Sequence, residues 1–155
     1  MSSKVKPIQQ DRQTVTPYLT IRNAGAAIEF YKEAFGATEK MRLAEPDGKV
    51  GHAEIGIGRA RIMISDEYPE LDVLGPQSRG GTTAGLHILV EDVDAVFSRA
   101  VAAGAKVLQA VSDEFYGERS GRLADPFGHV WYIATVKEEL SDEEVQSRYE
   151  ALMKD

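Results

Sequence analysis

Two of the three histidines, His52 and His87, stand in segments that alternate between apolar and polar residues. This is the pattern of a β-strand with one buried face. Glu54 follows His52 by two residues, so both side chains fall on the same face, opposite the apolar Ile55. A histidine and a carboxylate at this spacing can hold a metal ion or exchange a proton. A hydrogen bond that only supports the strand is the simpler interpretation of the pair.

His87 lies on the polar side of the strand predicted over 85–90, and a further polar pair, Glu118 and Arg119, begins a later strand. Adjacent residues of a strand point to opposite faces, so we expect one of Glu118 and Arg119 to line a site while the other holds structure. The third histidine, His129, directly follows a turn glycine, which favours a local hydrogen-bonding role.

The composition excludes several kinds of chemistry. There is no cysteine, which excludes disulfides, thiolate catalysis and cysteine-ligated metal sites. The sequence contains no nucleophile elbow, no phosphate-binding glycine loop and no H-E-x-x-H helix. The 25 acidic and 18 basic residues give a formal charge of −7, which disfavours nucleic-acid binding.

No apolar run approaches the roughly 20 residues of a membrane span, so we expect no membrane partner. Residues 1–12 lack the apolar stretch of a secretory signal, so we expect a cytoplasmic location.

The elements that must position these residues fall into two similar halves. The first half predicts strands over 15–22, 38–44, 50–57 and 59–66, and a helix that Asn23 caps and Gly36 ends. The second half predicts strands over 85–90, 106–111, 118–124 and 129–135, and a helix that Asp92 or Asp94 caps and Gly104 ends. The two halves repeat at a period of about 68–70 residues.

The sequence therefore predicts an α+β fold of two tandem βαβββ modules, whose mixed sheets curl around a cleft. Each module covers one sheet face with its helix and leaves the other face for a site. The predicted divisions are a flexible N-terminal arm (1–13), a first module (14–66), a linker (67–83), a second module (84–136) and a C-terminal helix (137–155). That last helix begins with a capping box at Ser141 and carries an apolar stripe, which predicts docking on the domain or on a partner subunit.

Three stretches resemble the glyoxalase/bleomycin-resistance/dioxygenase superfamily, also called the vicinal oxygen chelate (VOC) proteins. They are TIRN and AIEFYKEAFGA at 20–23 and 27–37, VEDVDAV and AGA at 90–96 and 103–105, and LADPFGHVW at 123–131. Two shorter pieces, GHAE at 51–54 and YGER at 116–119, are similar to its PhnB-like branch. The resemblance covers residues 14–136 as one VOC domain.

The resemblance implies glyoxalase-like paired modules around a cleft, often in a homodimer, and, in the metal enzymes, a divalent ion that chelates neighbouring oxygens of the substrate. Carried onto this sequence, the usual ligand positions are Thr16, Met63, Gly85 and Tyr132. Threonine is a poor ligand, methionine prefers soft metals and glycine has no side chain. We therefore predict no metal at the usual positions and no cofactor.

Two functions remain open, and the residues do not decide whether the protein is an enzyme. In the first, a metal-free cleft binds a small organic molecule, as in bleomycin-resistance proteins, with Glu54 and Glu118 meeting a cation. In the second, His52, Glu54 and His87 hold one divalent metal ion at a relocated site of a lyase, isomerase or dioxygenase. A module that only binds a partner through its C-terminal helix is a third possibility. The candidate ligand-binding residues are Tyr18, His52, Glu54, Met63, His87, Tyr116, Glu118, Arg119 and Tyr132.

Overall fold

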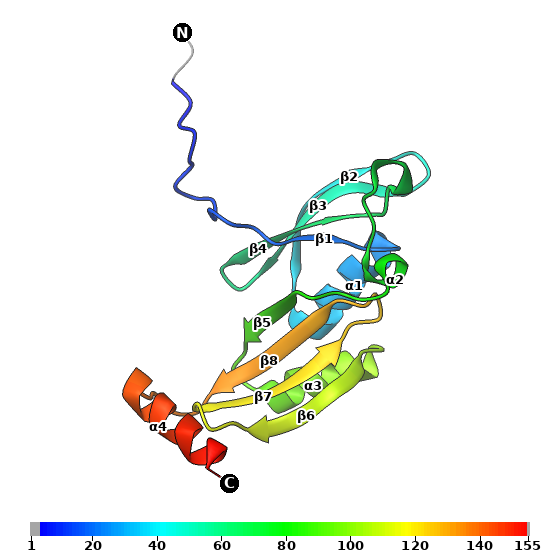
Figure 1. Cartoon of the computed structure of the whole chain (residues 1–155). Coiled ribbons are helices and arrows are strands. Elements are labelled where there is room, and N and C mark those ends of the chain that lie inside the picture. Colours follow the sequence, from blue (N-terminus) through cyan, green and yellow to red (C-terminus); the bar gives the residue numbers. More distant parts are fainter. Residues whose placement is uncertain (1–3, 155) are drawn as a thin grey trace.

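The computed structural model describes residues 4–154 and confirms the α+β fold of two βαβββ modules (Figure 1). The first module comprises β1 (Tyr18–Thr20), α1 (Ala24–Phe35), β2 (Thr38–Ala44), β3 (Val50–Ile57) and β4 (Ala60–Ser65). The connecting segment contains a 3-10 helix, η1 (Pro69–Leu71), and a short helix, α2 (Pro76–Arg79). The second module comprises β5 (Gly85–Leu89), α3 (Val93–Ala102), β6 (Lys106–Asp113), β7 (Glu118–Ala124) and β8 (Val130–Val136), and α4 (Asp142–Met153) follows it.

Each module forms a four-stranded sheet with the same strand order, β1-β4-β3-β2 in the first and β5-β8-β7-β6 in the second. The first and last strands of each module pair in parallel, and the other pairs are antiparallel. The register repeats as well, since Tyr18 pairs with Met63 as His87 pairs with Tyr132. A parallel pair requires a crossover connection, which the helix and the intervening hairpin strands supply in both modules.

The helix boundaries follow the predicted residues, but one cap differs. Asn23 precedes α1 with a left-handed backbone (φ 69°) and makes no capping bond through its side chain. Asp66 accepts the hydrogen bond from Ala24 N instead, at 2.9 Å, and its other oxygen accepts from Val50 N at 2.7 Å. In α3 the cap is Asp92, which accepts from Ala95 N at 3.1 Å. The residue that caps α1 is therefore 42 positions away in the sequence, where no local pattern indicates it.

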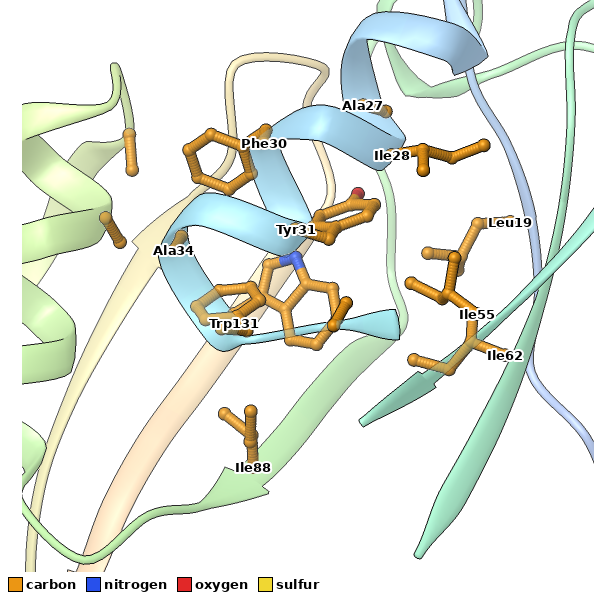
Figure 2. Close-up of a cluster of buried hydrophobic side chains, with 14 of the residues drawn as sticks. Leu19, Ala27, Ile28, Phe30, Tyr31, Ala34, Ile55, Ile62, Ile88 and Trp131 are labelled. Atoms are coloured by element: carbon orange, nitrogen blue, oxygen red, sulfur yellow. The ribbon is translucent and has the colours of Figure 1, made fainter. Parts of the chain in front are cut away.

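The two modules meet through their helix-covered faces and share one hydrophobic core. Trp131 of β8 packs against Tyr31 of α1 (Figure 2), with ring centroids 5.3 Å apart. Its ring centroid also lies 4.6 Å from that of Phe35. The two helices are also joined by a polar contact, because Arg99 of α3 donates to the carbonyl of Ala34 at 3.1 Å. The helix-free faces of both sheets consequently lie outside this shared core.

A buried carboxylate lies at the centre of the contact between the modules. Asp125, only 4% exposed, accepts hydrogen bonds from Tyr31 Oη at 2.5 Å and from Trp131 Nε1 at 3.0 Å. Its other oxygen accepts from the backbone of Phe127 and His129, which closes the D-P-F-G-H turn. Burial, with the neighbouring Asp125 carboxylate, raises the pKa of Tyr31 well above its ordinary value, so the phenol stays protonated and donates.

The same turn makes a second contact with the first module. His129 Nε2 lies 3.0 Å from the carbonyl of Thr20 in β1, so its bond joins residues 109 positions apart rather than the local groups expected from sequence. Gly128 adopts a left-handed backbone (φ 95°), and a Cβ there would lie 2.8 Å from Pro76 Cβ. Glycine is therefore needed at this position for both the turn and the close approach of α2.

The remaining segments differ in detail from the predicted ones. β1 is shorter than predicted at both ends, and it begins only at Tyr18 because Pro17 has no N–H to donate to the strand ladder. The arm is exposed over residues 4–13, and Gln13 bonds to the backbone of Arg61 in both directions. α4 contacts the domain through Arg148, which donates to Phe115 O, while Leu152 stays 55% exposed. Among residues 4–154, no helix has the length and apolar composition needed to cross a lipid bilayer.

We expect Asp125→Ala to lower the free energy of unfolding by about 3–5 kcal/mol, because it leaves buried donors without an acceptor. Tyr31→Phe removes one hydrogen bond to a charged group and should cost about 1.5–3 kcal/mol. Urea denaturation measures both values. The matched control is Tyr68→Phe, since the Tyr68 hydroxyl bonds to Glu45 near the surface; it should cost below about 1 kcal/mol. Equal losses for the two tyrosine variants would contradict the role of Asp125.

Candidate functional site

Most of the predicted site residues lie on the two helix-free sheet faces, called here the open faces. Side chains alternate along each strand, and the buried set faces the helices. The open face of the first sheet carries Tyr18, His52, Glu54 and Met63, and that of the second carries His87, Glu118 and Tyr132, with Tyr116 beside it. Arg119 points to the other side and pairs with Asp94 of α3 at 2.9 Å, so it holds structure while Glu118 faces outward.

On the first sheet four side chains form a continuous hydrogen-bonded chain. Tyr18 Oη lies 2.7 Å from His52 Nδ1, and His52 Nε2 lies 3.0 Å from Glu54 Oε2. Arg61 Nη1 donates to the other Glu54 oxygen at 3.2 Å. The hydrogen bond from His52, followed by the charge of Arg61, holds the pKa of Glu54 below its ordinary value. An ionised Glu54 only accepts, so His52 Nε2 donates to it, and in a neutral imidazole Nδ1 then accepts from Tyr18.

This chain runs between two hollows of the surface. One, of about 490 Å³, lies between the N-terminal arm and the sheet and is lined by Gln13, Thr16, Glu54, Arg61 and Met63 among others. The other, of about 480 Å³, is lined by Tyr18 and by residues of the segment that follows β4. Both volumes are in the range of small-molecule sites, roughly 300–1,000 Å³. Tyr18 and Glu54, which belong to one hydrogen-bonded chain, thus line two different hollows.

The open face of the second sheet holds a similar but separate pair. His87 Nε2 lies 3.2 Å from Glu118 Oε2, and Tyr116 Oη lies 3.3 Å from Ser120 Oγ. The Tyr132 ring lies directly over Gly85, where a Cβ would come within 2.5 Å of Tyr132 Cε2. A side chain at position 85 and the present position of the ring therefore exclude each other.

The residues at the usual metal positions do not fit a divalent ion. Gly85 has no donor, and the Tyr132 ring fills the space that a ligand side chain at this position would need. Met63 is a soft thioether and Thr16 a neutral hydroxyl, neither of which suits a hard divalent metal. We derive no chemistry through a metal at these four positions.

The relocated site of His52, Glu54 and His87 is also not assembled within one chain. His52 and Glu54 bond to each other on β3, whereas His87 lies on the other sheet and bonds to Glu118. The sheets meet through their helix-covered faces, which keeps the two open faces apart. No group of three or more histidine, aspartate or glutamate side chains suited to hold a metal ion exists among residues 4–154.

Two polar side chains of the open faces were not among the candidate residues predicted from sequence. Arg61 holds Glu54, and Arg122 lies on the open face of the second sheet beside Tyr132. Strand alternation places both arginines on the open faces, because Arg61 precedes the covered residue Ile62 and Arg122 precedes the covered residue Leu123.

The model of the Glyoxalase/Bleomycin resistance protein/Dioxygenase superfamily matches residues 13–133, and the chain belongs to this superfamily. An uncharacterised protein from Mycobacterium bovis is 40% identical over 136 residues, which cover 86% of this chain and 90% of that protein. TioX from Micromonospora is similar in structure, with a TM-score of 0.62 at 24% identity over 83% of this chain and all of TioX. The PhnB protein from Bacillus cereus has a TM-score of 0.64 at 20% identity over 80% of this chain and 100% of its own. These structures share the fold of this chain.

The lowered pKa of Glu54 predicts a pH-dependent contribution to stability. A carboxylate whose pKa is lower in the folded than in the unfolded state stabilises the fold above the unfolded value, near 4.5, and loses this effect as pH falls through the folded value. In urea denaturation, wild type should therefore exceed Glu54→Gln in free energy of unfolding at pH 7, and the difference should shrink as the pH falls below 4.5. Glu33→Gln, on the exposed side of α1, is the control and should change little at either pH. A Glu54→Gln deficit that stays constant from pH 7 to pH 3 would be inconsistent with this assignment.

The donor geometry predicts that the protein holds no stoichiometric divalent metal. Purified protein incubated with Ni, Zn, Mn or Fe and then dialysed should contain well below one equivalent, measured by elemental analysis. One equivalent that disappears in His52→Ala or His87→Ala would instead support the relocated metal site.

Proposed function

We propose that this protein binds a small organic molecule on its open faces without a metal ion, in the manner of bleomycin-resistance-type sequestration. The observation that carries the proposal is a ready-made set of aromatic and hydrogen-bonding side chains that no other described element covers. Tyr18 is 51% and Tyr132 40% exposed, although both belong to sheets with well-packed opposite faces. Exposed aromatic rings beside polar groups of fixed position are typical of small-molecule sites.

We further propose that the working form is a cytoplasmic homodimer. Both open faces lie outside the core that the modules share, so a ligand on either face stays exposed to solvent on one side. A second copy that places its open face opposite the first would close such a site. This arrangement is consistent with the dimers that the family resemblance implies.

An enzyme of the glyoxalase type is the second candidate. The observation that favours it is the chain from Tyr18 through His52 to Glu54, because a tyrosine that is hydrogen-bonded to a histidine–carboxylate pair is suited to proton transfer. A lyase or isomerase of this kind would use the Tyr18 hydroxyl at the surface of the hollow. The elemental analysis described above tests whether such an enzyme would be metal-dependent.

Isothermal titration of the full chain with benzyl alcohol, benzylammonium, benzoate, phenylphosphonate and metal-free bleomycin tests the binding proposal. We expect at least one of these probes to bind with a micromolar to low-millimolar Kd. Its affinity should fall tenfold or more, about 1.4 kcal/mol, in Tyr18→Ala or Tyr132→Ala, because the stacking surface is lost. Tyr149→Ala, on α4, is the control and should leave binding unchanged. Absence of binding by every probe, or equal binding by all three variants, would refute the proposal.

A further inference from the structure

One arginine of the sheets has no partner in a protein that has an excess of acidic residues. All ten arginines lie within the described residues, and those with ion pairs are Arg22, Arg42, Arg61, Arg79, Arg119 and Arg148. Arg99 donates to the carbonyl of Ala34. Of the other three, Arg12 and Arg59 are exposed on the arm and in a turn. Arg122 is partly buried in β7, and its Nε is buried without a hydrogen-bond partner.

Arg122 stands in a row of side chains that crosses the open face of the second sheet. The paired positions of this row are, from β5 to β6, His87, Tyr132, Arg122 and Gln109. The Arg122 guanidinium carbon lies 5.8 Å from the centroid of the Tyr132 ring. This stacking orients the guanidinium without neutralising its charge.

The acidic side chains of the open faces are already bonded elsewhere. Glu118, which shares this face, bonds to His87, and Glu54 of the first sheet bonds to His52 and Arg61. Glu54 pairs with Met63 as Arg122 pairs with Tyr132, so the repeated fold places a carboxylate and a guanidinium at equivalent positions. Of these two groups, Glu54 has an ion-pair partner, Arg61, among residues 4–154, and Arg122 has none.

We propose that Arg122 binds the anionic group of the ligand, a carboxylate or a phosphonate, with the Tyr132 ring packed against the ligand's apolar part. The proposal rests on the binding function proposed above and assigns the charge of the ligand. A guanidinium presents parallel N–H donors that match two oxygens of such a group, and a partly buried site strengthens these bonds. At Glu54 the cation expected from sequence is disfavoured, because Arg61 already pairs with that carboxylate. Glu118 bonds to His87 through one of its two oxygens.

The test compares probes that share a phenyl ring and differ in charge. Isothermal titration of the full chain should show benzoate or phenylphosphonate binding at least tenfold more tightly than benzylammonium and benzyl alcohol. Arg122→Gln should abolish this preference, and Arg122→Lys should lose most of it, because lysine keeps the charge and not the paired donors. Raising the salt from 20 mM to 500 mM should weaken the anion selectively, as for any charge pair near the surface. Arg79→Gln removes one positive charge from α2, and should leave all affinities unchanged.

A second measurement follows the NMR signal of the Arg122 side chain. The Nε–H resonance of Arg122, assigned by its absence from the spectrum of Arg122→Lys, should shift when the anion binds and stay in place with benzyl alcohol. This readout uses the wild-type chain, so a folding defect in Arg122→Gln does not affect it. The relative affinities of benzoate and phenylphosphonate then identify the preferred anion.

The outcomes separate the two proposals. If benzylammonium or benzyl alcohol binds through Tyr132 and the anions bind no better, the role of Arg122 is wrong and the binding function stands. Anion binding that is equally tight in Arg122→Gln would also overturn the assignment of Arg122. If no probe binds, the binding function fails and the role of Arg122 fails with it.

Discussion

The buried carboxylate of Asp125 determines how the two halves of this protein meet. It closes its own turn through two backbone N–H groups, and it accepts from Trp131 in the second module and from Tyr31 in the first. A buried charge is costly unless such donors surround it, so this geometry is strongly preferred over looser arrangements of the modules. The D-P-F-G-H motif is therefore a connector between modules as well as a turn.

The orientation of the modules decides where chemistry can occur. Because α1 and Trp131 pack together in the shared core, the helix-free faces remain accessible to a ligand. The two faces have the same backbone register and different side chains, with the hydrogen-bonded Tyr18–His52–Glu54 chain on the first and an unpaired Arg122 on the second. The two faces thus pair their charged groups differently: Glu54 bonds to Arg61 on the first, whereas Glu118 bonds to His87 on the second.

The repeat, the strand alternation and the superfamily motifs were sufficient to predict the fold class and the face on which His52 and Glu54 lie. They did not predict which groups bond across strands or between modules. His129 bonds to a carbonyl in β1, and Asp66 rather than Asn23 caps α1, because register and module packing bring together residues far apart in the chain. The supposed ligand trio failed for the same reason, since alternation assigns a face of a strand and says nothing about the orientation of one sheet relative to another.

The central claim is that ligands bind to the open faces of modules joined at their helix-covered sides. Backbone amide shifts of ¹⁵N-labelled protein, followed while phenylphosphonate is added, test it most directly. We predict that the affected amides cluster in β3, β4, β7 and β8, and that the amide signals inside α1 and α3 do not shift. Shifts concentrated in the two helices and around Asp125 would place the ligand between the modules and contradict the account.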